Sequence, residues 1–513
     1  MTRDVRRSSA AGLQRWAVLA TVSAGLLMIV LDNSILYTAL PTLTADLGAT
    51  GSQALWIINA YPVVMAGLLL GSGTLGDRVG HRRMFMIGLT TFGAASLLAA
   101  FSPTAAILIA ARALLAVGAA SMMPATLALI AVTFENERER NIAFGVWGSL
   151  STVGMALGPI VGGALLEAFW WGSVFLINVP IVVAAIIATL VLAPPNDPNP
   201  NKHWDLRSSV WALLGLVGAV LTIKELAHSP QNWGLIAIAV VASAAGLTLF
   251  VRRQRRLREP LLEFAIFRDP GFASGVIAAS LAMFAIAGVQ LITTQRYQLL
   301  EGLSPLDAGL LVAAAALGAL PASLIGAAIL HRTGLRPVIT GGLTLAVAGA
   351  TLVLAGAQTT MPVLVAGLIV LGAGTGFAMS VASIAIVGGA PPGREGMASS
   401  VEEVSYEFGS LTAVAMLGSL VSFVYSLVVV LPEGLPESAR ESVIETLAHA
   451  DARPDVFDAA HVAYSTAYTV TLIVVIAVLA IAVIATARLL RRRSPSLAAP
   501  TSTPPGEVRD EAK

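Results

Sequence analysis

The sequence predicts an all-α polytopic membrane protein. Of its 513 residues, 56% are hydrophobic and 12% are charged, whereas a soluble domain averages about 45–50% apolar and about 25% charged residues. The apolar residues also gather into segments long enough to cross about 30 Å of hydrocarbon as helices. These fourteen segments lie near residues 16–40, 53–75, 84–101, 105–133, 141–167, 173–193, 209–227, 233–251, 272–294, 306–330, 337–357, 362–388, 399–430 and 463–488.

The basic residues favour one orientation of these helices. When the N-terminus is placed inside, most of the 31 lysines and arginines fall on the cytoplasmic side, and the outer connections hold only Lys224, Arg296, Arg440 and Arg453. Cytoplasmic loops carry the excess of positive charge in membrane proteins, so we expect both termini in the cytoplasm. The basic run Arg252–Arg258 abuts a span and is expected to contact membrane lipid rather than nucleic acid.

An internal repeat indicates two related bundles. When Gly80 is set on Gly334, the sequence DRVGHR at 77–82 faces HRTGLR at 331–336, each after the second span of its half. Such repeats are typical of transporters whose substrate site lies between two bundles. We expect an N-terminal six-helix bundle at 1–193, a linker with two extra transmembrane helices at 194–271, a C-terminal six-helix bundle at 272–493 with an extracellular loop at 432–461, and a disordered cytoplasmic tail at 494–513.

Three carboxylates lie at the head of the thirteenth apolar segment: Glu402, Glu403 and Glu407. An ionised acid at bilayer depth costs about 2.5–3.5 kcal/mol on insertion scales, so such residues usually face a cavity, a partner or a proton path. In a helix, Glu403 and Glu407 share one face. The alternative is that these acids lie at the level of the lipid headgroups, which applies mainly to Glu402.

Asp32 lies deep in the first apolar segment, and Arg112 lies in the fourth. A proton carrier needs an acid that loads and releases protons near neutral pH, and Asp32 is the best single candidate for this role. The alternative is a structural ion pair between Asp32 and Arg112. A pair that breaks when Asp32 is protonated satisfies both interpretations.

The fifth apolar segment has glycine at every fourth residue, at Gly154, Gly158 and Gly162. One side of this helix is therefore bare backbone that another helix can approach closely. Packing alone explains such a pattern. The embedded pairs Gly158-Pro159 and Gly162-Gly163 favour a helix that bends or moves, because proline frees a backbone carbonyl.

Several aromatic residues could complete a site for flat apolar cations. A cation against a ring face gains about 0.5–2 kcal/mol, depending on desolvation. Packing in the core or an interfacial belt is the alternative for most of them. The candidates are Tyr37, Trp56, Tyr61, Trp147, Phe377 and Tyr406, of which Trp56 and Tyr61 would be tested first.

The motifs together resemble the major facilitator superfamily, and in particular its fourteen-span drug:proton antiporters. The opening of the thirteenth segment looks like that of the antiseptic and quaternary-ammonium exporters. The matching stretches are LDNSILYTALP (31–41), GTLGDRVGHRR (73–83), GPIVGG (158–163), FLINVP (175–180), Tyr297-Gln298 with GLSPLDAGL (302–310), and VEEVSYEFG (401–409).

The resemblance implies roles for individual residues. Asp77, Arg78, Gly80 and Arg82 would form a cytoplasmic gating motif. The antiporter helix would contain Gly154, Gly158, Pro159, Gly162 and Gly163. The proton-coupling residues would be Asp32, Arg112, Glu403 and Glu407, and the acids Glu402, Glu403 and Glu407 would bind the cation. Besides these acids, the expected substrate-binding residues are the aromatic candidates Tyr37, Trp56, Tyr61 and Tyr406, together with Asn59.

The chain also departs from the family pattern. Some antiseptic exporters carry an acid in span two, where this chain has Asn59, and another in span ten, where Gly309–Leu330 contains none. These differences make monovalent cations the better expected cargo. The motif that usually reads Arg-x-x-Gln-Gly continues here as Arg112-Ala113-Leu114-Leu115-Ala116.

These features predict a proton-coupled multidrug efflux antiporter that exports small lipophilic cations by alternating access. The cargo would be quaternary ammonium compounds, dyes or antiseptics. Protons would be the coupling ion, with no cofactor and no metal site. The protein would be a monomer in the bacterial cytoplasmic membrane. None of the lysines Lys202, Lys224 and Lys513 follows a glycine as an ATPase P-loop requires.

The sequence leaves two alternative functions. The first is an exporter of a neutral or anionic antibiotic or secondary metabolite, serving self-resistance. The second is a non-transporting receptor or a lipid-handling scaffold. An enzyme is not expected, because no metal-ligand spacing or nucleophile–base arrangement exceeds chance, and the absence of cysteine excludes thiolate chemistry.

Overall fold

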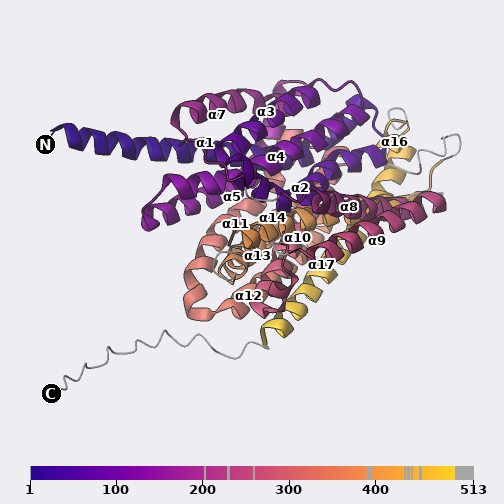
Figure 1. Cartoon of the computed structure of the whole chain (residues 1–513). Helices are drawn as coiled ribbons and strands as arrows, with labels where there is room; N and C mark the ends of the chain where they lie inside the picture. The colour runs from indigo at the N-terminus through magenta and orange to yellow at the C-terminus, as the bar shows by residue number, and fades with distance from the viewer. Residues whose placement is uncertain are drawn as a thin grey trace, which may run out of the picture.

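The computed structural model is a bundle of long helices (Figure 1). It describes residues 2–200, 204–227, 231–257, 260–389, 395–432, 435, 440, 443–449 and 453–491, and these contain no β-strand. The first seven helices are α1 (Thr2–Leu47), α2 (Gly51–Val79), α3 (His81–Ala100), α4 (Ala105–Thr133), α5 (Glu137–Ala168), α6 (Ser173–Leu176) and α7 (Asn178–Leu192). The remaining helices are α8 (Leu206–Ala227), α9 (Trp233–Gln254), α10 (Pro270–Leu299), α11 (Pro305–Thr333), α12 (Leu335–Gln358), α13 (Met361–Val387), α14 (Glu395–Ala413), α15 (Ser419–Val428), α16 (Val443–Leu447) and α17 (Pro454–Arg491).

Thirteen stretches of described helix are long and apolar enough to cross a membrane by length and composition. Of the expected spans, α5 falls short of this measure, because its described apolar stretch runs only from Val153 to Ala168. α6 and α7 together make one span, Ser173–Leu192, and α14 and α15 make another, Met397–Val428. The all-α polytopic class is therefore confirmed. The expected tail at 494–513 lies outside the described residues.

The helices form two bundles and an additional pair. Helices α1 to α7 pack on one another, as do α10 to α17, whereas α8 packs on α9 and on α2. The bundles meet where α5 packs on α11, α2 on α14 and α1 on α10. In Figure 1, α1 begins and α17 ends on the side of the molecule away from α16. We call these two sides the terminal end and the α16 end.

The repeat found in the sequence has a counterpart in the backbone. Among the described residues, four glycines have positive φ: Gly48 (58°), Gly80 (96°), Gly302 (68°) and Gly334 (79°). Gly48 and Gly302 lie between the first and second long helices of their bundles, and Gly80 and Gly334 lie between the second and third. Glycine adopts such angles without the steric strain that a side chain brings. The two bundles therefore turn the chain in the same way at the same two joints.

The helix that carries the three glutamates is not regular. A π-helical turn at Val414–Gly418 separates α14 from α15, although the sequence reads as one apolar run. Gly418 in this turn packs beside the side chain of Leu55 on α2, where a Cβ atom would collide. Such π-turns are frequent at functional sites. The irregularity lies where the second bundle contacts the first.

An ion pair fastens α8 to α9 at the terminal end. Arg253 donates from Nη2 to Oδ1 of Asp205 at 2.8 Å and from Nε to Oδ2 at 2.9 Å, and the hydroxyl of Ser208 also donates to this carboxylate. Burial opposes ionisation of Asp205, but the hydrogen bonds from Arg253 and Ser208 outweigh it and lower the pKa of Asp205 below its usual 3.8. At the α16 end, Lys224 of α8 donates to Oγ of Ser52 at 2.6 Å. The additional pair is thus held to itself and to α2.

Candidate functional site

A buried ion pair lies inside the first bundle. Arg112 of α4 donates from Nη1 to Oδ2 of Asp32 on α1 at 2.5 Å, and neither side chain is exposed. The other carboxylate oxygen, Oδ1, accepts from Nδ2 of Asn178 at the start of α7 at 2.8 Å. Nδ2 of Asn178 also donates to Oγ of Ser96 on α3 at 3.2 Å. Donors from two helices therefore hold Asp32, as a buried charge requires.

Arg112 extends this network to α2. Its Nε donates to the carbonyl oxygen of Ile57 at 3.2 Å, and its guanidinium lies 4.7 Å from the ring centroid of Tyr61. A desolvated cation–π contact of this kind contributes about 2 kcal/mol. Nη2 of Arg112 and the hydroxyl of Tyr61 have no hydrogen-bond partner in the described structure. Two polar groups beside the ion pair can therefore serve a further partner.

The glutamates of α14 face this network from the second bundle. Tyr61 interacts electrostatically with Glu403 and Glu407 as well as with Asp32 and Arg112. Glu407 also interacts with Arg112, and its Oε2 has no hydrogen-bond partner among the described residues. The side chains of Glu403 and Glu407 are half-buried. The sequence-predicted acids of the two bundles thus lie on either side of one interface.

Glu402 lies on a different face of α14 from this pair. It accepts a hydrogen bond from the phenol of Tyr406 at 2.9 Å. The hydroxyl of Ser383 on α13 is a second hydrogen-bond partner. Glu402 is therefore engaged within the second bundle, and Tyr406 with it. Ser383 had no distinguishing signal in the sequence, because serine is common in membrane helices.

The other predicted binding residues are not all brought together. Tyr37 of α1 shares a hydrogen bond of 3.0 Å with the hydroxyl of Ser410 on α14, which links the bundles beside Glu407. Asn59 is fully buried, and neither polar atom of its carboxamide has a partner in the described structure. Trp56 instead lies under Lys224 of α8, with Nζ 5.0 Å from the ring centroid. Trp56 therefore contacts the additional helix pair, and it also packs against the cluster that contains Leu411 of α14.

The glycines of α5 give it two bare sides. The side facing α1 lies beside Asp32, since Ser34 donates to the carbonyl of Gly154 at 3.2 Å. A Cβ atom on Gly154, Gly158 or Gly162 would collide with Val30, Ser34 or Ile35 respectively. The other side faces α11, where a Cβ atom on Gly163 would meet the backbone of Leu306 and one on Gly309 would meet the carbonyl of Pro159. α5 is therefore in close backbone contact with both bundles.

The predicted gating motif is tied to its own bundle in this conformation. The backbone carbonyl of Asp77 accepts from the amide of residue 199 at 3.0 Å, and Arg82 donates to a backbone carbonyl near the end of α7 at 2.8 Å. Gly80 lies against the carboxamide of Asn196. Nδ2 of Asn196 donates to the carbonyl oxygen of Val79 at 2.9 Å. Arg78 is exposed. Asn196 belongs to the polar connection after α7, and the sequence analysis did not single it out.

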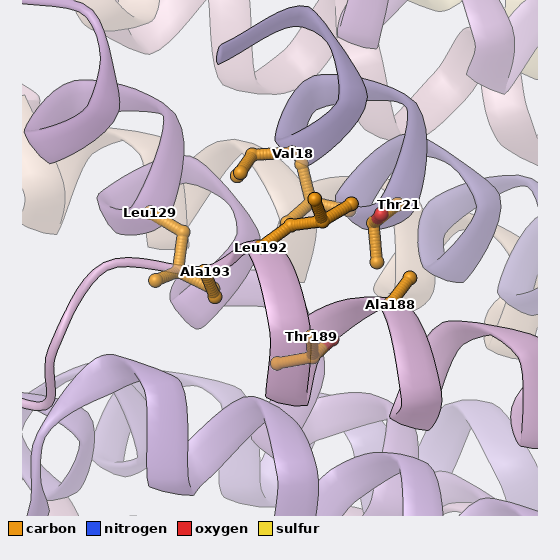
Figure 2. Close-up of a pocket in the computed structure, with 8 residues that line it drawn as sticks. Val18, Thr21, Leu129, Ala188, Thr189, Leu192 and Ala193 are labelled. Atoms are coloured by element: carbon orange, nitrogen blue, oxygen red, sulfur yellow. The ribbon is translucent and has the colours of Figure 1, made fainter. Parts of the chain in front are cut away.

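A small pocket elsewhere in the first bundle does not belong to this site. Figure 2 shows it between α1, α4 and α7, and its lining is mainly apolar. Its two hydroxyl groups, on Thr21 and Thr189, donate to carbonyls of their own helices at 2.8 Å and 2.6 Å. The pocket therefore offers no charge to a cation. The lining residues are Val18, Thr21, Val22, Leu129, Ala188, Thr189, Leu192 and Ala193.

The site carries acids, amides and aromatic rings, and these suit proton exchange and cation binding. No group of three or more His, Cys, Asp or Glu side chains in the described part of the chain is placed to hold a metal ion. Sequence reasoning missed Asn178 and Ser96 as partners of Asp32. A polar amide within the apolar segment at 173–193 was the available signal, because polar side chains at bilayer depth usually have a partner.

Comparisons with known proteins agree with this architecture. A family model described as Major Facilitator Superfamily matches residues 22–298, and one described as Sugar (and other) transporter matches residues 270–425. The chain is 36% identical over 425 residues to the methyl viologen resistance protein SmvA of Salmonella typhimurium, covering 82% of this chain and 85% of that protein. It is 37% identical over 424 residues to the multidrug efflux pump LfrA of Mycolicibacterium smegmatis, covering 82% and 83%.

Solved structures share the fold. The crystal structure of a bacterial homolog to the human lysosomal transporter Spinster, in an inward-facing and unoccupied conformation, matches with a TM-score of 0.65. The match covers 94% of this chain and 99% of that chain at 15% sequence identity. The arrangement of helices, the family models and the similarity to efflux proteins lead to one conclusion. The chain is a multi-pass membrane protein that belongs to the major facilitator superfamily of transporters.

Proposed function

We propose that the protein is a proton-coupled multidrug antiporter that exports small lipophilic cations from the bacterial cytoplasm. The observation that carries this proposal is the position of Glu407. Its carboxylate has an oxygen without a hydrogen-bond partner in the described structure and faces the Asp32–Arg112 pair from the other bundle. Substrate and coupling-ion sites of repeat-built transporters lie at such an interface. The names of SmvA and LfrA support drug resistance and drug efflux as the process.

The site divides into a proton-coupling part and a cation-binding part. Asp32 and Arg112 form the coupling pair, because protonation of Asp32 removes the charge that holds Arg112. Glu407 and Glu403 attract the cation, and Tyr61 supplies a ring between these acids and Arg112. The remaining cation-binding residues are Tyr37, Asn59, Tyr406 and Glu402. Methyl viologen, from the name of SmvA, is a suitable divalent probe beside monovalent dyes.

The conformation supports a state closed at the α16 end. There α5 and α11 are in backbone contact through Gly163 and Gly309. Gln298 of α10 also donates to the carbonyl of Thr38 on α1 at 3.0 Å. We assign the α16 end to the outside and the terminal end to the cytoplasm, because the basic residues gather in the connections of the terminal end. α5 then provides the fourteenth crossing.

A transport cycle follows from these assignments. In the inward-open state the ionised Glu407 and Glu403 bind a cation from the cytoplasm. The transporter then opens outward as the contact between α5 and α11 separates, and the gating motif at Asp77–Arg82 closes the cytoplasmic side. Protons from outside neutralise the acids and release the cation. Return of the protonated carrier and proton release inside reset the site.

Transport by inside-out membrane vesicles tests the proposal. Wild-type protein is expected to accumulate ethidium or methyl viologen when the vesicles are energised, and each added cation should move protons in the opposite direction. Asp32→Asn and Glu407→Gln should both lose coupled transport. Glu135→Gln, which changes an exposed glutamate, is the matched control. Coupled efflux of normal size in both site variants would overturn the proposal.

A further inference from the structure

Asn178 is an uncharged hydrogen-bond partner of the buried carboxylate of Asp32. It is the first residue of α7, is 2% exposed, and lies in a span that contains no charged residue. One amide nitrogen reaches two acceptors, Oδ1 of Asp32 at 2.8 Å and Oγ of Ser96 at 3.2 Å. Both hydrogens of the NH₂ group are therefore used. The side chain joins α7 to α1 and to α3 at the point where the proposed coupling acid lies.

The two partners of Asp32 respond differently to a proton. A guanidinium has only donors, so Arg112 matches the ionised carboxylate and offers no acceptor to a carboxylic acid. A carboxamide has an NH₂ with two donors and an oxygen with two lone pairs. A half-turn of the carboxamide of Asn178 would place its oxygen where Nδ2 now lies. That oxygen could then accept from the protonated Asp32 and from the hydroxyl of Ser96.

The hydroxyl of Ser96 fits both arrangements, because a serine hydroxyl can accept from Nδ2 or donate to the reversed oxygen. The ionisable groups that face Asp32 from the packed helices are Arg112 of α4 and Tyr61 of α2, with Glu407 of α14 beyond them. α5 presents its bare glycine side to α1, and α3 presents Ser96. Among the described partners of Asp32, the amide of Asn178 is the one that can reverse.

We infer that Asn178 is a positioning residue that holds the Asp32 carboxyl group in both protonation states by reversing its carboxamide. Protonation of Asp32 then releases Arg112 while Asp32 stays in place between α1, α3 and α7. The freed guanidinium remains beside Tyr61 and turns toward Glu407. This inference rests on the proposed proton coupling and adds the group that keeps the coupling acid oriented through the cycle.

Two substitutions at Asn178 separate this role from a merely structural one. Asn178→Leu keeps the size of the side chain and removes both donor and acceptor. It should slow proton-driven efflux about tenfold or more, the effect expected when a hydrogen bond to a charged group is lost. Exchange of labelled for unlabelled cation needs no net proton turnover. The rate of this exchange should therefore stay within about twofold of the wild-type rate. This split shows that the variant is folded and binds cargo.

Asn178→Asp provides a directional readout and preserves the shape of the residue. A second acid beside Asp32 disfavours two adjacent negative charges and favours retention of a proton, so the optimum of efflux should move to higher pH by about one unit. Thr189→Val is the matched control. Thr189 is buried on the same helix and bonds only to the carbonyl of Ala185 in the described structure, so this variant should keep the wild-type pH profile.

The outcomes distinguish failure of the inference from failure of the proposed function. Absence of proton-coupled efflux in the wild-type protein overturns the proposed function. Normal coupling in the wild type, with an unchanged rate in Asn178→Leu or an unchanged pH optimum in Asn178→Asp, overturns the role of Asn178 alone. Equal loss of exchange and efflux in Asn178→Leu also contradicts it, because that result describes a packing defect. If Asn178→Leu does not fold, the pH optimum of Asn178→Asp decides.

Discussion

Arg112 and Asp32 meet 2.5 Å apart with neither side chain exposed. Two charges without water are stable only while each has its partner, and removal of one partner costs about 3–5 kcal/mol. The pair is therefore sensitive to any event that neutralises one member. Protonation of Asp32 is such an event. The same geometry that stabilises the resting bundle thus makes the pair a suitable switch.

The first prediction concerns the stability of this pair. Asp32→Asn should lower the free energy of unfolding by about 3–5 kcal/mol, because Arg112 remains buried and charged. The double variant Asp32→Asn with Arg112→Met should recover much of that loss and still fail to couple transport. Thermal denaturation of the purified protein in detergent measures the first effect, with exposed Asp46→Asn on the same helix as control. A double variant no more stable than Asp32→Asn would contradict this account of the pair.

The second prediction concerns the close contacts of α5 and α11. Gly158→Ala places a methyl group against Ser34, and Gly309→Ala places one against the carbonyl of Pro159. Overpacking of this kind costs about 1–3 kcal/mol, and efflux should fall with it. Gly341→Ala on α12 is the matched control, because its Cβ would meet nothing within 4 Å.

A second-site change sharpens this test. Ser34→Gly removes the side chain that a methyl group at position 158 would meet, so it should partly restore the efflux and melting temperature of Gly158→Ala. Loss of function in Gly341→Ala equal to that in Gly158→Ala would show that helix flexibility, rather than close approach, is what the glycines provide.

The third prediction is a pH dependence at the additional helix pair. The pKa of Asp205 in the folded protein lies below 3.8, so its ion pair with Arg253 stabilises the fold at neutral pH. This contribution is present above the unfolded pKa and is lost as the pH falls through the lower folded value. The melting temperature of Asp205→Asn should therefore stay below that of wild type from pH 7 down to pH 4, and the gap should close only at lower pH. The control Asp197→Asn changes an exposed residue and should melt at the wild-type temperature throughout. If the difference between Asp205→Asn and the wild type disappears between pH 6 and pH 5, the ion pair with Arg253 is not its cause.

The parts of the site that carry charge could be predicted from the sequence. Asp32 and Arg112 were expected to pair because an ionised group at bilayer depth needs a partner, and the structure places them together. The glutamates of α14 were expected to face a cavity for the same reason. The turns at Gly80 and Gly334 could be predicted because, at each of them, a short polar connection separates two long apolar segments of the sequence.

The parts that depend on packing could not be predicted in this way. Asn178 carries no charge, so its hydrogen bond to Asp32 depends on how α7 is placed against α1. Trp56 matched the pattern of a binding residue, but Lys224 of the additional pair occupies its ring face. The π-helical turn at Val414–Gly418 depends on the close approach of Leu55 to Gly418. Hydrophobic periodicity contains none of these tertiary contacts.

Competition between a cation and protons for Glu407, coupled to protonation of Asp32, is the central claim, and proton release on cation binding measures it directly. A lipophilic cation is added to purified protein in weakly buffered detergent solution, and a pH-sensitive dye records the protons released. The account predicts release on cation binding by the wild type and reduced release by Glu407→Gln and by Asp32→Asn. Cation binding to the wild type without proton release would contradict it, and so would proton release by both variants as large as that of the wild type.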